Sequence, residues 1–268
     1  MSILQIVVLA IIQGITEFLP ISSSAHLVLP SALLGWQDQG LAFDVAVHVG
    51  TLVAVIIYFS KDIRSLTVGW CNQTFAGNPS TEGRLAWLIV LATIPAGLAG
   101  LIFNDFVEEN LRSLWVIAIT TIVFGVLLGV ADKYSSRQRA MEELNWRHAL
   151  MIGVAQALAL IPGTSRSGIT LTTALALGFD RVSAASFSFL LSIPVILLSG
   201  GYKSIELMQL SNVPWGEIGL ATLLSGITAY ACIHVFLGWI NRIGMMPFVW
   251  YRIFLGLLLI GLLWGGVV

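Results

Sequence analysis

The sequence has few charged residues for its length. Its 268 residues include 13 lysines and arginines and 14 aspartates and glutamates, so charged residues make up 10% of the chain, against about 25% in an ordinary soluble domain. The formal net charge is −1, and the basic residues are scattered instead of clustered. This composition excludes nucleic acid as a partner and excludes a soluble globular domain.

Cysteine is equally scarce, with Cys71 in a polar segment and Cys232 in an apolar one. Two cysteines in such different surroundings predict neither a disulfide framework nor a zinc cluster. We expect both to be ordinary small residues.

What the sequence does contain is apolar residues, at 57% of the chain and with a mean hydropathy of +0.91. Six apolar stretches are long enough to cross a bilayer, which takes about 17–25 residues. They cover 43–59, 85–103, 113–131, 184–201, 217–237 and 248–266. The sequence therefore predicts an all-α polytopic membrane protein with six transmembrane helices.

Two further apolar stretches, 2–35 and 149–178, are each broken near the middle by a proline and a run of hydroxyl-bearing residues. Such a break leaves backbone N–H groups unpaired at membrane depth unless they line a cavity or bind a ligand. We expect each stretch to be a re-entrant helix-turn-helix, although they can also be read as full spans. The unpaired N–H groups would suit an anion.

The distribution of positive charge supports the re-entrant model. If both broken stretches enter and leave on one side, nine basic residues fall on the same face, which the positive-inside rule makes cytoplasmic, with both termini outside. These residues are Lys61, Arg64, Arg84, Lys133, Arg137, Arg139, Arg147, Arg181 and Arg242.

Weak internal similarity predicts a repeat. Pro20 and Pro162 open similar turns, and the tripeptide Leu-Ala-Thr occurs at 91–93 and again at 220–222. We therefore expect a single integral membrane domain over 1–268, made of halves at about 1–131 and 149–268 and joined by a cytoplasmic loop, 132–148. Three spans in each half would invert the second half, so that the two turns meet near the midplane.

The first turn carries an acid, hydroxyls and an imidazole. Gln13 and Glu17 are four residues apart and share one helix face, Pro20 ends that helix, and the next begins among Ser22, Ser23 and Ser24, with His26 close behind. A serine at this position is either a helix cap or a nucleophile.

The second turn carries groups that suit a phosphate. Gly163 allows close backbone approach, the hydroxyls come from Thr164, Ser165, Ser167 and Thr170, and Arg166 presents a planar guanidinium to phosphate oxygens. An ionisable group at this depth is a functional candidate, although Glu17 can also be read as a structural partner of Arg166. We predict phosphoryl chemistry, with Glu17, Ser23, His26 and Arg166 as the catalytic residues.

These motifs resemble those of a known family. Gln13–Glu17 resembles a (Glu/Gln)-x-x-x-Glu motif, and Pro162–Thr170 resembles the Pro-Gly-x-Ser-Arg-Ser-x-x-Thr motif of bacterial undecaprenyl-diphosphate phosphatases of the BacA/UppP family. The resemblance covers essentially the whole chain and includes the stretch from Ser22 to His26. The first motif position is Gln13 where other members carry a glutamate, so a clamp of two carboxylates on a metal is not expected.

The resemblance implies hydrolysis of undecaprenyl diphosphate to the monophosphate and inorganic phosphate. That reaction recycles the lipid carrier of cell-wall synthesis and confers bacitracin resistance. It also implies a bacterial inner-membrane protein whose site opens to the periplasmic side, with a polyprenyl diphosphate as substrate and membrane lipids as surroundings. A homodimer is left open.

Within this reading we expect Ser23 to attack phosphorus, activated by Glu17 or His26, with direct attack by water as the competitor. The remaining residues of the two turns, Gln13, Ser22, Ser24, Gly163, Thr164, Ser165, Ser167 and Thr170, would bind substrate. A divalent cation, Mg²⁺ or Ca²⁺, could bridge the phosphate oxygens with Glu17 as its ligand.

Two other classes compete with this reading. A polyprenyl-phosphate transporter or flippase would have the same inverted repeat and broken helices. A type 2 phosphatidic acid phosphatase would share fragments such as Ser165-Arg166, but it is disfavoured because Thr172 stands where its histidine belongs.

Overall fold

The computed structural model describes residues 1–37, 39–207 and 214–266, which form eleven α-helices and two short 3-10 helices. Six helices are long and apolar enough to cross a membrane, as predicted. They are α3 (Gly40–Tyr58), α5 (Thr81–Asn110), α6 (Leu114–Tyr134), α9 (Arg181–Leu207), α10 (Trp215–Ile243) and α11 (Met246–Trp264).

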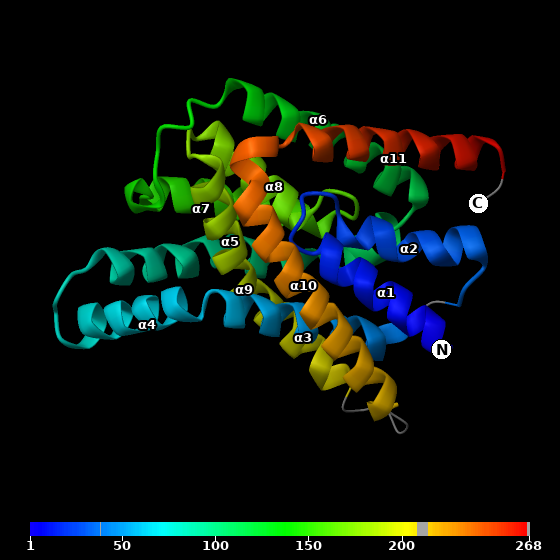
Figure 1. Ribbon diagram of the computed structural model, residues 1–268, viewed down its shortest axis with the longest axis horizontal. Coiled ribbons are helices and arrows are strands. Elements are labelled where there is room, and N and C mark those ends of the chain that lie inside the picture. Colours follow the sequence, from blue (N-terminus) through cyan, green and yellow to red (C-terminus); the bar gives the residue numbers. More distant parts are fainter. Residues whose placement is uncertain (38, 208–213, 267–268) are drawn as a thin grey trace.

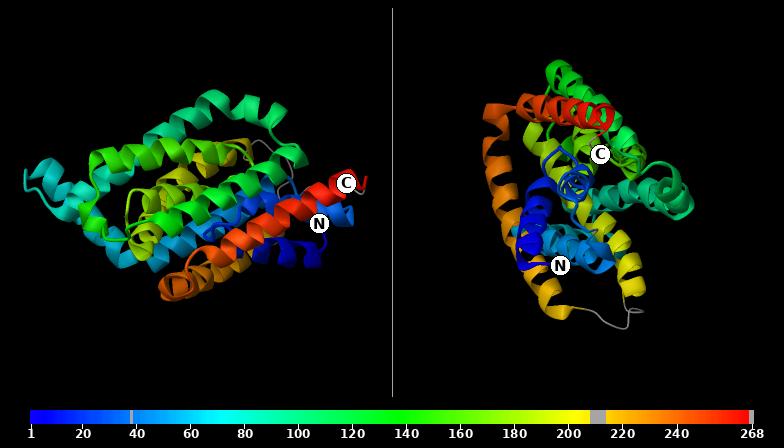
Figure 2. Two further views of the ribbon diagram at one scale, coloured as in Figure 1. Left: turned by 90° about the horizontal axis from the view of Figure 1, so that it is seen from above. Right: turned by 90° about the vertical axis from the view of Figure 1, so that its right-hand side faces the viewer.

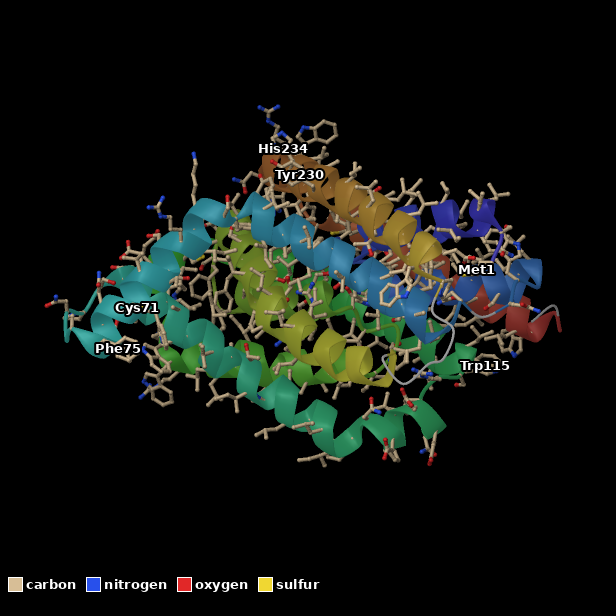
Figure 3. The ribbon with its side chains drawn as sticks, turned by 90° about the horizontal axis from the view of Figure 1, so that it is seen from below. Met1, Cys71, Phe75, Trp115, Tyr230 and His234 are labelled. Carbon is tan, nitrogen blue, oxygen red and sulfur yellow. The ribbon has the colours of Figure 1, made fainter. Side chains whose placement is uncertain are left out.

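The outer surface of these helices is apolar. Large side chains project from them into the surroundings (Figure 3), and Leu101 on α5, for example, is 79% exposed. A soluble protein would not leave so many such side chains uncovered, so the exposed faces are those that lipid covers.

Each broken stretch forms two helices joined by a turn. The first contains α1 (Ile3–Thr16) and α2 (Ser23–Leu34), and the second contains α7 (Trp146–Ala157), the 3-10 helix η2 (Leu158–Leu160) and α8 (Arg166–Ala176). Pro20 and Pro162 lie in the turns, where a residue without a backbone N–H interrupts the helical ladder. Both termini lie at one end of the long axis, opposite the tip of the α4–α5 hairpin (Figure 1).

One segment differs from the sequence-based expectation. Residues 60–84 join the predicted spans 43–59 and 85–103, and their many polar residues predict a loop. In the structure most of them form α4 (Ser60–Phe75), which is separated from α3 by Phe59 alone and packs along α5. A Cβ on Gly69 would lie 2.7 Å from the backbone nitrogen of Gly83, so these glycines let the two helices approach closely. Tertiary packing stabilises this helix, which its polar composition does not predict. The other connection, 132–147, contains the 3-10 helix η1 (Met141–Glu143).

The broken helices lie against the long ones. α1 packs on α10 and α3, and α7 packs on α5; seen along the long axis, the first broken pair lies inside the helix arrangement (Figure 2). A Cβ on Gly14 would lie 2.6 Å from the Ser225 carbonyl oxygen, and one on Gly153 would lie 2.5 Å from that of Ala92. Small residues thus hold each half-helix close to its neighbour. The division of the chain into two repeated halves stays a prediction.

A buried ion pair joins three elements at one end of the bundle. The Asp132 carboxylate, 3% exposed, accepts two bonds from Arg181, at 2.7 Å from Nε and 2.8 Å from Nη2, and a third from the Met245 backbone N–H at 3.3 Å. It therefore ties together α6, α9 and the start of α11.

We predict that Asp132→Asn lowers the free energy of unfolding by about 3–5 kcal/mol, because it leaves the Arg181 charge, whose side chain is only 16% exposed, without an anionic partner. The measurement is denaturant unfolding in mixed micelles. The matched control is Glu108→Gln, which breaks the exposed pair with Arg112 at 3.2 Å and should cost less than about 1 kcal/mol. Equal losses in the two variants would contradict the assignment.

Candidate active site

The two turns share an unusual backbone conformation. Ser22, which precedes α2, has φ 73° and ψ 99°, and Ser165, which precedes α8, has φ 71° and ψ 115°. A residue other than glycine rarely adopts positive φ, and the cost is of order 1–3 kcal/mol unless the surroundings impose it. Both turns therefore hold their following helix start in a strained, pre-set geometry.

The two turns contact each other directly. The Gly163 backbone N–H donates to the Ser24 hydroxyl at 3.5 Å, and the Ser167 hydroxyl donates to the Leu19 carbonyl at 2.9 Å. Segments separated by about 140 residues thus meet inside the bundle and form one site.

Glu17 is the centre of this site. Its Oε2 accepts from Gln13 Nε2 at 2.9 Å and from Ser23 Oγ at 3.2 Å, and its Oε1 accepts from Arg166 Nη2 at 3.3 Å. The carboxylate is 8% exposed. It is therefore desolvated, charge-balanced by Arg166, and in contact with the hydroxyl of Ser23.

The second turn positions Arg166 and several hydroxyls. Arg166 Nη1 donates to the Ser188 carbonyl at 3.1 Å, and the Ser188 hydroxyl lies 2.6 Å from that of Thr170. Ser165 caps α8 by accepting from the Gly168 N–H at 3.1 Å. Ser188, on α9, is a supporting residue that the sequence motifs do not point to.

Three buried polar atoms in the site have no hydrogen-bond partner within the described part of the chain. They are Gln13 Oε1, Thr164 Oγ1 and Arg166 Nε. Buried polar groups normally find partners. Two of these atoms belong to the second turn and one belongs to Gln13 beside Glu17, so the site has unpaired polar groups with which a polar ligand could form hydrogen bonds.

His26 is turned away from Ser23. Its Nδ1 lies 2.7 Å from the Ser22 carbonyl and its Nε2 lies 2.6 Å from the Tyr251 hydroxyl. Both ring nitrogens therefore have partners, so in this arrangement Glu17, and not His26, is the base in contact with the Ser23 hydroxyl.

Two residues outside the motifs complete the site. His48 on α3, which its place within an apolar span would assign to packing, brings Nε2 to 3.9 Å from Glu17 Oε2. Arg252 on α11 is fully buried and donates to four carbonyl groups: Pro20 at 3.2 Å, Thr121 at 3.0 Å, and Gly163 and Thr164 each at 2.9 Å. Only their ionisable character within an apolar span could have flagged them.

Chemically, the arrangement brings a hydroxyl, a carboxylate that accepts its hydrogen bond, and a guanidinium to one point beside two helix N-termini. Such a set can bind a phosphate, activate an oxygen nucleophile and stabilise negative charge.

We predict that Arg252→Lys lowers the free energy of unfolding by about 2–6 kcal/mol, because a single ammonium cannot replace the guanidinium at all four carbonyls and each buried carbonyl left unpaired costs about 1–3 kcal/mol. Unfolding in mixed micelles measures it. Arg242→Lys on the exposed end of α10 is the control, and a loss no larger than that of the control would refute this role.

Comparisons with known proteins identify the family of this chain. The family model described as bacitracin resistance protein BacA matches residues 6–258. Proteins named undecaprenyl-diphosphatase are 61% identical in Saccharophagus degradans, covering 98% of this chain and 99% of the relative, and 59% identical in Teredinibacter turnerae, covering 97% and 98%. A third, in Hahella chejuensis, is 60% identical over 96% of both chains. With this match over nearly its whole length, the chain belongs to the BacA family.

Proposed function

We propose that this protein hydrolyses undecaprenyl diphosphate to undecaprenyl phosphate and inorganic phosphate, recycling the carrier lipid and conferring bacitracin resistance. One observation carries the proposal: the buried Glu17 carboxylate contacts Ser23 of one turn and Arg166 of the other. In this proposal the nucleophile, its base and the arginine that binds phosphate therefore lie together inside a membrane bundle. The relatives' name, undecaprenyl-diphosphatase, supports this substrate.

In the proposed mechanism, Ser23 Oγ attacks the terminal phosphorus and its proton passes to Glu17. The bond between that phosphorus and the bridging oxygen breaks, and undecaprenyl phosphate leaves. Water then cleaves the Ser23 phosphoester, releasing inorganic phosphate and regenerating the hydroxyl. The 3.2 Å contact between Ser23 Oγ and Glu17 Oε2 supports Glu17 as the base.

The diphosphate would lie against the second turn. Arg166 would hold it through Nε, which has no partner among the described residues, and through its terminal nitrogens, while the Thr164 hydroxyl and the first N–H groups of α8 donate to other oxygens. Negative charge that develops during attack is stabilised there. Ser22, Ser24, Ser165, Ser167 and Thr170 maintain the shape of the two turns.

A divalent cation fits one part of this site. Gln13 donates a hydrogen bond to Glu17 through Nε2, and its Oε1 is buried and unpaired within the described ranges. Hard oxygen atoms such as these are the ligands that Mg²⁺ and Ca²⁺ prefer. We propose that Glu17 and Gln13 would hold such an ion, which when bound would neutralise phosphate charge.

We propose an orientation in the inner membrane with both termini and the site opening outside. Basic residues support it: Lys61 and Arg64 lie on α4, Lys133 lies in the last turn of α6, and Arg137 follows that helix. The α4–α5 hairpin lies at the end opposite the termini (Figure 1).

A transporter or flippase is the second candidate, since broken helices that meet inside a bundle are also a transporter architecture. The contact between Ser23 and Glu17 favours the hydrolase, because moving a lipid phosphate requires no activated hydroxyl.

We predict that Glu17→Gln reduces phosphate release from undecaprenyl diphosphate by about 100-fold or more, because the amide keeps the shape but cannot take the Ser23 proton. Arg166→Lys should cause a comparable loss. Phosphate release by purified, folded protein is the measurement, and Glu109→Gln, an exposed carboxylate, is the control. Stoichiometric lipid binding without release by the wild type would instead favour transport.

We predict a covalent phosphate on Ser23. Acid quenching of the wild type after brief exposure to substrate labelled in the terminal phosphate should trap label on protein, and Ser23→Ala should retain none. A wild type that turns over without trapped label, together with an active Ser23→Ala variant, would mean that water attacks directly.

A further inference from the structure

The residue before Arg252 also reaches the site. Tyr251 on α11 lies with its hydroxyl 2.6 Å from His26 Nε2, and the two rings are stacked with centroids 5.5 Å apart and planes 7° from parallel. Neither sequence motif includes Tyr251. Its side chain is 41% exposed, whereas His26 is 8% exposed, so the tyrosine closes one side of the imidazole.

The contacts of His26 define its tautomer. A carbonyl oxygen only accepts hydrogen bonds, so the 2.7 Å contact with the Ser22 carbonyl requires a proton on Nδ1. In neutral His26 the other nitrogen, Nε2, is then an acceptor, and the Tyr251 hydroxyl is its donor. The tyrosine therefore stabilises the one neutral tautomer that can hold Ser22.

Ser22 needs this support because its φ of 73° is strained, and it directly precedes Ser23 at the start of α2. A change at the Ser22 carbonyl would move the first turn of α2 and with it Ser23. A misplacement of about 1 Å in reacting groups can cost 100-fold in rate.

We propose that Tyr251 is a positioning residue for the phosphatase reaction. It fixes the tautomer of His26, His26 holds the Ser22 carbonyl, and the strained turn presents the Ser23 hydroxyl to Glu17. His26 acts through this contact rather than as the base for Ser23.

Tyr251→Phe tests the proposal because it removes the hydroxyl and keeps the ring. We expect kcat for phosphate release to fall about 10- to 100-fold with KM changed less than about twofold. In a His26→Ala background the same substitution should have no further effect, since the two residues act in one chain. Tyr230→Phe, a similarly exposed tyrosine on α10, is the matched control and should keep wild-type kcat.

A second measurement is independent of turnover. Nitrogen-15 NMR of labelled histidine in the wild type should show His26 with a proton on Nδ1 and none on Nε2, and Tyr251→Phe should shift this signal toward a mixture of tautomers. A proton on Nε2 of wild-type His26, an unchanged kcat, or a full additional loss in the His26→Ala background would each overturn the proposal. It rests on the proposed hydrolysis, whose own failure would appear as a wild type that releases no phosphate, with the NMR result unaffected.

Discussion

The arrangement of the two turns depends on the Arg252 guanidinium, which contacts both of them and links them to α6 through the Thr121 carbonyl. The guanidinium donates to carbonyls of Pro20 in the first turn and of Gly163 and Thr164 in the second, and it is fully buried. Turns that interrupt helices inside a membrane leave carbonyl groups that lipid cannot satisfy. The planar guanidinium of Arg252 has several donors, so it satisfies carbonyl groups of both turns at once and sets the spacing between the turns.

With that spacing fixed, the two turns divide the chemistry. The first supplies Glu17 and Ser23, and the second supplies Arg166, while the strained Ser22 and Ser165 give both turns the same backbone conformation. The strain persists because hydrogen bonds from outside each turn oppose its relaxation. A rigid site of this kind aims its donors before substrate arrives, which is how electrostatic stabilisation of a phosphoryl transition state is achieved.

Sequence patterns predicted the features that depend on local composition. The six spans follow from length and hydropathy, and the two turns follow from Pro20 and Pro162 among hydroxyl-bearing residues. Helix α4 was missed because its stability comes from packing on α5, which no local pattern encodes. A contact between Glu17 and Arg166 was predictable because buried opposite charges usually pair. The structure shows this ion pair.

The supporting residues escaped prediction for a different reason. Arg252 and Tyr251 lie on α11, His48 on α3 and Ser188 on α9, so each lies on a different helix from the residue it supports. Each lies in an apolar span where packing is the commoner role. Only the three-dimensional arrangement distinguishes a guanidinium that donates hydrogen bonds to several carbonyl groups from one that extends to the membrane surface.

The central claim is that both turns bind a single diphosphate. The most direct measurement is an experimental structure of the protein with a polyprenyl methylene-diphosphonate, which binds like substrate and resists hydrolysis. The account predicts the terminal phosphonate at hydrogen-bond distance, about 3 Å, from both the Ser23 hydroxyl and the Arg166 guanidinium. A head group bound at only one turn, or at neither, would contradict it.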